Sequence, residues 1–285
     1  MTINEILTPS FKTVRRVRDQ RPMWQRRLSA ESSFCKAVVS CGYLTQEQME
    51  RAVLRYRLGC SRDGGVIFWQ IDQLDHVFDG KIMYYRPDCH RDHQRHPNWV
   101  SHLLKRHYGC QDLDIPSAHC LFGAHLAPPK PPPVGEEAPP RPIPEASSPT
   151  RSLSPEGREK ASPTGEGLEG AAAVVESEKT AVIMSELFPE YLWLASGGLH
   201  ELTAVKLFPL RHYRVVLFPD TDEHHESFQL WYDVAQEAQR AYGIRCTVSP
   251  LLELKATPEQ KARKIDLVDL LAPPLTHSRD ELAYP

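Results

Sequence analysis

A proline-rich stretch in the middle of the chain limits what the sequence can fold into more than any other feature. Residues 128–163 contain twelve of the 25 prolines in this 285-residue chain and few aromatic or β-branched residues. Such a composition cannot form a hydrophobic core, so we predict a disordered Pro/Ser/Gly-rich linker between two folded regions. The predicted order is a basic N-terminal arm (1–30), a first folded region (31–126), the linker (127–170), a second folded region (171–272) and a C-terminal tail (273–285).

The composition narrows the class of protein. No run reaches the roughly 18 apolar residues that a membrane span needs, and the N-terminus lacks the apolar segment of a secretory signal. We therefore expect a cytoplasmic protein that does not contact a membrane. The seven cysteines are never spaced as C-x-x-C, which argues against a disulfide framework and against a zinc ribbon. The seven Lys and Arg residues of the arm suit a phosphate backbone, although a solvated tail explains them equally well.

The first region predicts a small α+β unit. Residues 32–59 have a helical pattern, with Thr45 as an N-cap and Gly59 as a stop. Two strand-like segments, 64–72 and 80–87, follow with polar turn residues between them, and 98–109 is again helical. This order predicts a small antiparallel sheet accompanied by helices.

The second region alternates strands with helices. Apolar β-type segments and amphipathic segments follow one another, which predicts parallel βαβ units with helices on both faces of one sheet. The expected strands are 172–175, 191–195, 213–218 and 244–249, and the expected helices are 178–188, one starting near 200, and 226–242.

Three acids follow two of these strands. Glu176 comes directly after the first strand, and Asp220 and Asp222 form a D-x-D pair after the third. Functional groups of a parallel α/β sheet gather at the carboxyl ends of its strands, and carboxylates there suit Mg²⁺ or Mn²⁺. We predict a metal site made by Glu176, Asp220 and Asp222; the alternative is that these acids are solvated residues at helix starts.

Residues 172–272 resemble a Toprim domain, the catalytic module of bacterial primases, type IA and type II topoisomerases and some nucleases. The matching motifs are the glutamate of "VVESEKTA", the D-x-D of "VLFPDTD", the glycine pair of "WLASGGLHELTA" and the late segment "KIDLVDLL". The resemblance implies a Rossmann-like parallel sheet in which Glu176, Asp220 and Asp222 are catalytic and hold Mg²⁺. It makes Asp266 a further candidate metal ligand and Asp269 a secondary one.

The first region resembles the part of a bacterial primase core that precedes Toprim. The segments "YRLG", "GVIFWQID", "GKIMYYRP" and "CLFGAHL" occur in the order found there. The strongest likeness is to Toprim-like proteins of unknown function carried on bacterial mobile elements, in which "FWQID", "NWV", "VVESEKTA", "ASGGL" and "VLFPD" recur in this order. The sequence departs from the primase pattern at Ser177, where a glycine is usual, at Thr180, where an acid is usual, and after Asp222, where a glycine often follows.

Several other residues are candidates for binding. By resemblance, Lys81 and Arg86 lie on the strand that faces the template in primases, and Lys179 follows Glu176 closely enough to reach a phosphate. The segment "CHRDHQRHPNW" predicts either a polar loop whose Arg95, His93 and His96 contact nucleic-acid phosphates or, with less support, a zinc site. The candidate zinc ligands are Cys89, His90, His93 and His96.

Taken together, these features favour a primase-like Toprim protein that carries out Mg-dependent phosphoryl transfer on nucleic acid during DNA replication. Its expected partners are single-stranded DNA and nucleotides. The alternatives are a Toprim nuclease and a non-catalytic nucleic-acid-binding accessory module. The sequence has no phosphate-binding G-x-x-x-x-G-K-[ST] motif, so a helicase or other replication partner is expected to be a separate chain.

Overall fold

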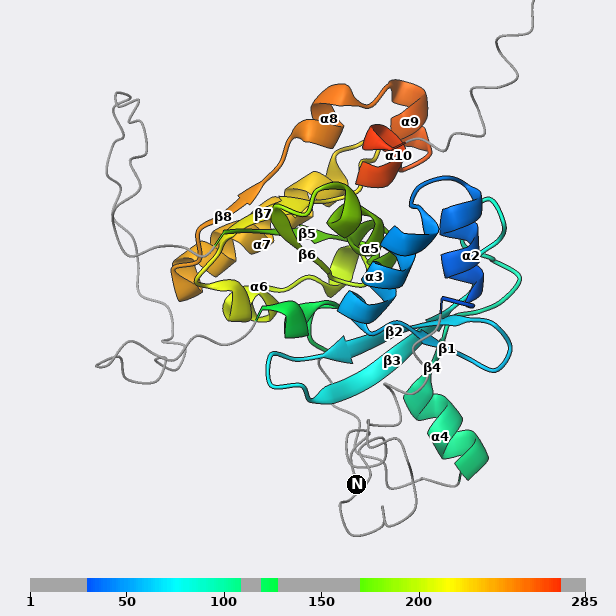
Figure 1. Cartoon of the computed structure of the whole chain (residues 1–285). Helices are drawn as coiled ribbons and strands as arrows, with labels where there is room; N and C mark the ends of the chain where they lie inside the picture. The colour runs from blue at the N-terminus through cyan, green and yellow to red at the C-terminus, as the bar shows by residue number, and fades with distance from the viewer. Residues whose placement is uncertain (1–29, 109–118, 128–169, 273–285) are drawn as a thin grey trace, which may run out of the picture.

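The computed structural model describes residues 30–108, 119–127 and 170–272 (Figure 1). Nearly all of the predicted arm and of the predicted linker, and the whole C-terminal tail, lie outside these ranges. The described chain forms two four-stranded sheets, an antiparallel one in the order β1-β2-β3-β4 and a parallel one in the order β6-β5-β7-β8. No helix in the described ranges is both long and apolar enough to cross a bilayer.

The first region begins with two helices where the sequence pattern predicted one helical stretch. Helix α2 (Ser33–Ser40) stops before a turn at Gly42, whose φ of 73° favours glycine. Thr45 then caps helix α3 (Gln46–Tyr56) through a reciprocal capping box with Gln48, as predicted. The expected stop at Gly59 is wrong, because α3 already ends at Arg57 in a left-handed conformation and Gly59 begins strand β1 (Gly59–Cys60).

Apolar side chains pack on both faces of the antiparallel sheet. Its other strands are β2 (Val66–Ile71), β3 (Val77–Met83) and β4 (Asn98–Trp99), and helix α4 (Val100–Tyr108) follows β4 directly. Side chains alternate along β3, so that Met83 packs toward the second region while Ile82 joins a cluster with Val100 of α4.

The parallel sheet matches the predicted alternation of strands and helices. Its order places β5 in the centre, with β6 on one side and β7 on the other. The strands are β5 (Ala171–Val175), β6 (Tyr191–Ala195), β7 (Arg214–Phe218) and β8 (Cys246–Val248). The helices are α5 (Glu178–Leu187), α6 (Ala204–Leu207), α7 (Glu226–Tyr242), α8 (Leu251–Lys255), α9 (Pro258–Ala262) and α10 (Leu267–Leu271), with short 3₁₀ turns at Ala124–Leu126, Leu199–Glu201 and Phe208–Leu210.

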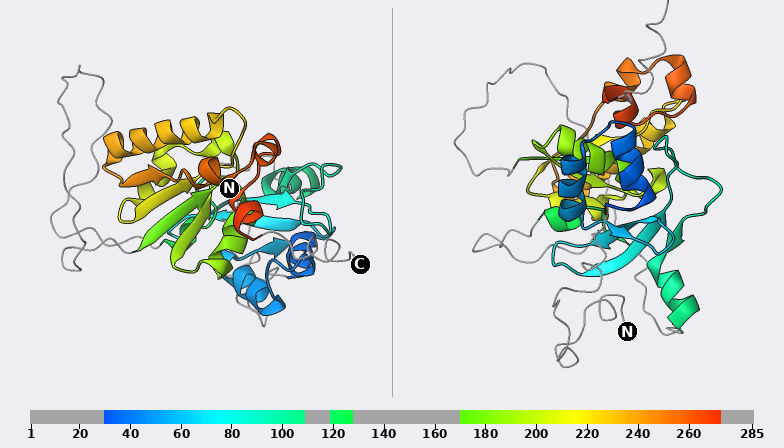
Figure 2. Two further views of the ribbon diagram at one scale, coloured as in Figure 1. Left: turned by 90° about the horizontal axis from the view of Figure 1, so that it is seen from above. Right: turned by 45° about the vertical axis from the view of Figure 1, so that its right-hand side comes forward.

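The parallel sheet is buried on both faces. Alternate residues of β5 belong to different clusters: Ala172 and Val174 join the cluster that includes α6 and α7, whereas Ala173 and Val175 join the cluster that includes α5. Helices α7 and α5 lie on opposite faces of the sheet (Figure 2). This explains why β5 is apolar throughout rather than alternating with polar residues.

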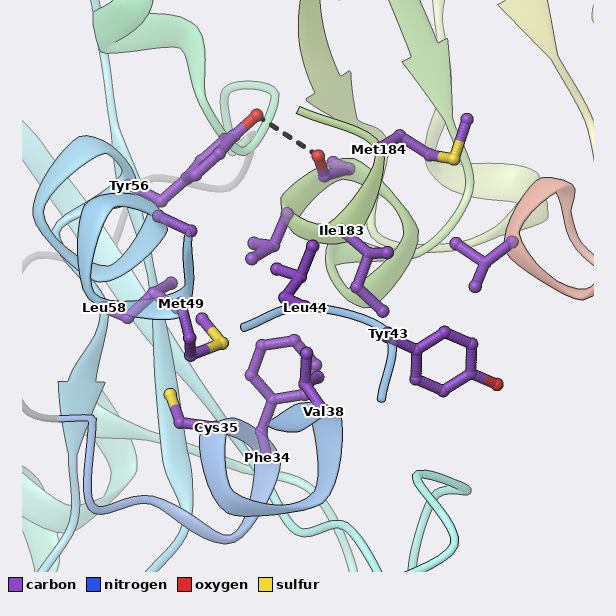
Figure 3. Close-up of a cluster of buried hydrophobic side chains, with 14 of the residues drawn as sticks. Phe34, Cys35, Val38, Tyr43, Leu44, Met49, Tyr56, Leu58, Ile183 and Met184 are labelled. Carbon is purple, nitrogen blue, oxygen red and sulfur yellow. Dashed lines mark hydrogen bonds between the residues drawn. The ribbon is translucent and has the colours of Figure 1, made fainter. Parts of the chain in front are cut away.

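The two predicted regions share one hydrophobic core. The cluster on the α5 side contains α2 and α3 residues such as Phe34 and Met49 together with Ile183 and Met184 of α5 (Figure 3). The buried hydroxyl of Tyr56 donates to the carbonyl oxygens of Ala181 at 3.3 Å and Trp193 at 2.9 Å. The first region therefore covers one face of the parallel sheet.

Candidate functional site

The candidate site lies where the strand order of the parallel sheet reverses. From β5 the chain moves outward to β6 and then returns to the other side of β5 to form β7, so the switch point lies between β5 and β7. Ligands of open α/β sheets bind in the crevice outside the carboxyl ends of the strands at such a point. Because Val175 pairs with Phe218, Glu176 and Asp220 leave these two strands side by side.

Glu176 and Asp220 are in direct contact. The backbone N–H of Asp220 donates to Oε1 of Glu176 at 3.0 Å. Burial, together with the charges of Asp222 and Asp266, raises the pKa of Glu176 from 4.5 to about 7. Burial and the neighbouring Glu176 carboxylate also raise the pKa of Asp220 well above its usual value. Two neighbouring carboxylates with raised pKa values titrate as a pair and retain a proton near neutral pH.

Asp222 lies beside this pair but is occupied elsewhere. Its carboxylate accepts the backbone N–H groups of His224 at 2.8 Å, Glu226 at 3.0 Å and Ser227 at 2.8 Å, all at the beginning of α7. Burial opposes ionisation, but these N–H groups lower the pKa of Asp222 to about 2. Asp222 therefore stabilises the start of α7 in the way that an N-cap side chain does.

Asp266 belongs to a buried network behind the pair. It lies 2.9 Å from Nζ of Lys179, accepts the hydroxyl of Thr180 at 2.8 Å, and forms a capping box with Asp269 at the start of α10. Burial alone would raise the pKa of Asp266, but Lys179 holds it below its usual value. Thr180, which stands where the Toprim pattern has an acid, thus donates a hydrogen bond to Asp266. Lys179 forms an ion pair with Asp266 as well.

The residues present fit a divalent cation as a carboxylate pair. Neither Glu176 nor Asp220 has an ion-pair partner among the described residues, so a cation would supply the missing positive charge. Within the part of the chain that the structure describes, no three His, Cys, Asp or Glu side chains are arranged to hold a metal. Mg²⁺ commonly uses one or two carboxylates and completes its shell with water and substrate phosphates, which suits two acids. The predicted magnesium ion stays a prediction.

A further carboxylate near the site, that of Glu178, was not anticipated from the sequence. Glu178, in the first turn of α5, is paired with Lys81 of β3 at 3.0 Å. Lys81, expected to face nucleic acid, is thus largely buried between the two regions. No sequence signal indicates this pair, because it depends on how the first region docks on α5.

The remaining candidate residues lie on the outer side of the first region. Arg86 pairs with Asp88 at 2.7 Å on the surface. Arg95 pairs with Asp63 at 2.6 Å, and its guanidinium lies 3.4 Å from the centre of the Tyr84 ring. Both arginines keep exposed surface, so their predicted contact with phosphates stays a prediction.

The predicted zinc ligands point in different directions. Cys89 is buried in the core, and burial raises the pKa of its thiol to about 12. His90, His93 and His96 are exposed on the loop. Since these side chains are not gathered into a metal-binding group among the described residues, the arrangement suits a polar loop better than a zinc site.

Comparison with known proteins gives one family and a distant structural likeness. The family model described as "Domain of unknown function (DUF6371)" matches residues 32–134 and 168–221, which is more than half of the chain. No curated protein matches the sequence. Two solved chains match, including the primase fragment of the bacteriophage T7 primase-helicase protein, with 14% identity and a TM-score of 0.37 over 75% of this chain. The aligned part spans 63% of that fragment, and at this TM-score the likeness carries no argument about activity.

Proposed function

This chain belongs to the DUF6371 family, whose description assigns no activity, and we propose that it uses a divalent cation held by Glu176 and Asp220 for phosphoryl transfer on nucleic acid. The observation that carries the proposal is the hydrogen bond from the backbone N–H of Asp220 to the carboxylate of Glu176 at the switch point of the sheet, where neither carboxyl group has an ion-pair partner among the described residues. Their positions also match the glutamate and the first aspartate of the Toprim motif that the sequence resembles.

The pair suits phosphate chemistry better than other reactions. A Mg²⁺ or Mn²⁺ ion bound there would neutralise phosphate charge and orient a phosphate oxygen. Glu176 and Asp220 would hold the cation, and Asp222 would fix the beginning of α7 directly after the loop that carries Asp220. Single-stranded DNA and nucleotides are the proposed substrates, and primer synthesis is the proposed reaction, with hydrolysis of nucleic acid as the variant in which water is the nucleophile.

The test measures metal binding before activity. Calorimetric titration of the full chain with Mn²⁺ and Mg²⁺, with a single-stranded oligonucleotide present, would compare wild type with Glu176→Gln and Asp220→Asn. Glu237→Gln, on the exposed side of α7, is the matched control. We expect wild type and the control to bind the cation and to extend or cleave the labelled oligonucleotide, and both site variants to lose binding and activity together. Unchanged cation binding in the two site variants would refute the proposal.

One observation favours a second candidate, a nucleic-acid-binding module without catalysis. Three positions of the Toprim pattern serve the fold here: Asp222 caps α7, Ser177 caps α5 through the N–H of Thr180, and Thr180 binds Asp266. A module of this kind would retain the oligonucleotide without any divalent cation and would be indifferent to Asp220→Asn. Fluorescence anisotropy of the labelled oligonucleotide with and without a chelator separates the two candidates.

A further inference from the structure

Near each end of helix α5, a glutamate with a buried side chain forms an ion pair with the first region. Glu178, in the first turn, pairs with Lys81, and Glu186, in the last turn, pairs with Arg51 and Arg55. Each glutamate side chain is only 3% exposed. The two glutamates are therefore equally buried, although Arg51 and Arg55 are more exposed than Lys81, and they differ in their distance along the helix from Glu176.

Lys81 has an acceptor for each of its three ammonium hydrogens. Its Nζ lies 3.0 Å from Oε1 of Glu178, 3.3 Å from Oε2 of the same residue and 3.0 Å from the carbonyl oxygen of Gly197. The Lys81 side chain is 15% exposed. A lysine ammonium has three donors and no acceptor, so this environment satisfies it completely.

The same contacts lead directly to the backbone that carries Glu176. The N–H of Gly197 donates to the carbonyl oxygen of Glu176 at 2.9 Å, and the N–H of Ser196 donates to that of Val175 at 3.0 Å. Gly197 has a φ of 92°, which places a tight turn directly after β6. Lys81 thus contacts both Glu178, two residues after Glu176, and Gly197, whose N–H binds the carbonyl oxygen of Glu176.

We propose that Lys81 is a positioning residue of the cation site, which holds Glu176 in place although it touches neither the cation nor the substrate. The inference rests on the proposed function, because it concerns the same pair of carboxylates. It makes the antiparallel sheet part of the site: the strand β3 supplies the group that orders the carboxyl end of β5.

Positioning and simple electrostatics predict opposite results when the lysine charge is removed. Lys81→Met keeps an unbranched, apolar stem of similar length but releases Glu178 and Gly197. If Lys81 acted only through its charge, its loss would make the site more negative and strengthen cation binding. If Lys81 positions Glu176, cation binding becomes weaker, as is usual when an outer partner of a metal ligand is removed.

The experiment titrates the full chain with Mn²⁺ alone, by calorimetry, for wild type, Lys81→Met, Lys81→Arg and Glu186→Gln. We expect Lys81→Met to raise the Kd about 10-fold or more. Glu186→Gln, which weakens the ion pairs with Arg51 and Arg55 at the far end of α5, should lower the melting temperature but leave the Kd within about twofold of wild type. Lys81→Arg keeps the charge but not the three-acceptor geometry, so we expect an intermediate Kd; this variant decides the question if Lys81→Met does not fold.

The outcomes distinguish this inference from the function on which it rests. If wild type binds no Mn²⁺, both the proposed function and the positioning role are overturned. If wild type binds Mn²⁺ and the two Lys81 variants bind it equally well or more tightly, only the positioning role is overturned. An equal weakening in Glu186→Gln would also overturn it, because the effect would then follow from the general loss of an ion pair.

Discussion

Raising the pH should destabilise the metal-free protein through the Glu176–Asp220 pair. Burial and nearby acids raise the pKa of Glu176 from 4.5 to about 7, so the folded protein keeps a proton that the unfolded chain has already released. The folded state binds more protons across this range, and its stability is therefore complete below pH 4.5 and is lost as the pH rises through 7. At about 1.4 kcal/mol for each unit of pKa, the complete loss from Glu176 is about 3.5 kcal/mol.

The partly buried His125 has the opposite effect on the pH dependence of stability, and the experiment must separate the two contributions. Burial lowers the pKa of His125 from 6.5 to about 4, so its contribution to stability is lost as the pH falls through 6.5 toward 4. The two effects overlap, and the wild-type curve alone does not separate them. The difference between wild type and Glu176→Gln cancels the histidine, because His125 is present in both proteins.

The assay is urea unfolding in the presence of a chelator at several pH values between about 4.5 and 7.5. We expect the free energy of unfolding of wild type to fall relative to Glu176→Gln by up to about 3 kcal/mol across this range. Glu237→Gln, which changes an exposed carboxylate, should follow wild type. Parallel curves for wild type and Glu176→Gln would show that Glu176 has no raised pKa and would refute the account of the pair.

Three further outcomes follow from buried contacts. Tyr56→Phe should lower the free energy of unfolding, measured by chemical denaturation, by about 1–3 kcal/mol, because the carbonyl oxygen of Trp193 loses its hydroxyl donor. An unchanged free energy of unfolding would mean that water replaces the hydroxyl. Asp222→Ala should lower it by about 0.5–2 kcal/mol, whereas Asp222→Ser should restore part of the loss if capping of α7 is its role. Cys89 should resist iodoacetamide in the native protein and react after unfolding, because the thiol is buried and burial raises its pKa to about 12. Mass spectrometry of labelled peptides measures this reaction, and rapid labelling of the native protein would contradict the burial of Cys89.

The alternation of strands and helices from β5 to β8 was predictable from the sequence, and so was the meeting of Glu176 with Asp220, whereas the short helices α8, α9 and α10 were not predicted. Both follow from strand periodicity and from the rule that carboxyl ends of parallel strands share one edge. The role of Asp222 was not predictable, because D-x-D does not say which oxygen accepts the N–H groups of α7. The pairing of Lys81 with Glu178 depends on contacts between residues 97 positions apart, for which one sequence carries no local signal.

The proline-rich stretch separates two parts of the sequence but not two parts of the fold. The predicted first region ends at 126, yet Phe122 forms an antiparallel bridge with Ala195 on the free edge of β6, and Leu121 and Ala124 pack under the parallel sheet. These residues precede the linker in sequence and complete the second region in space.

This closure of β6 has a consequence for how the protein folds and for how it can be divided. An uncovered edge strand offers unpaired N–H and C=O groups to any other strand. In β6, Phe122 binds the N–H and C=O of Ala195, and the Tyr56 hydroxyl donates to the carbonyl oxygen of Trp193. A fragment that starts at Gly170 would emerge with this edge open and with one apolar face of its sheet bare. We expect such a fragment to self-associate, and we expect the two halves of the full chain to unfold in a single cooperative transition.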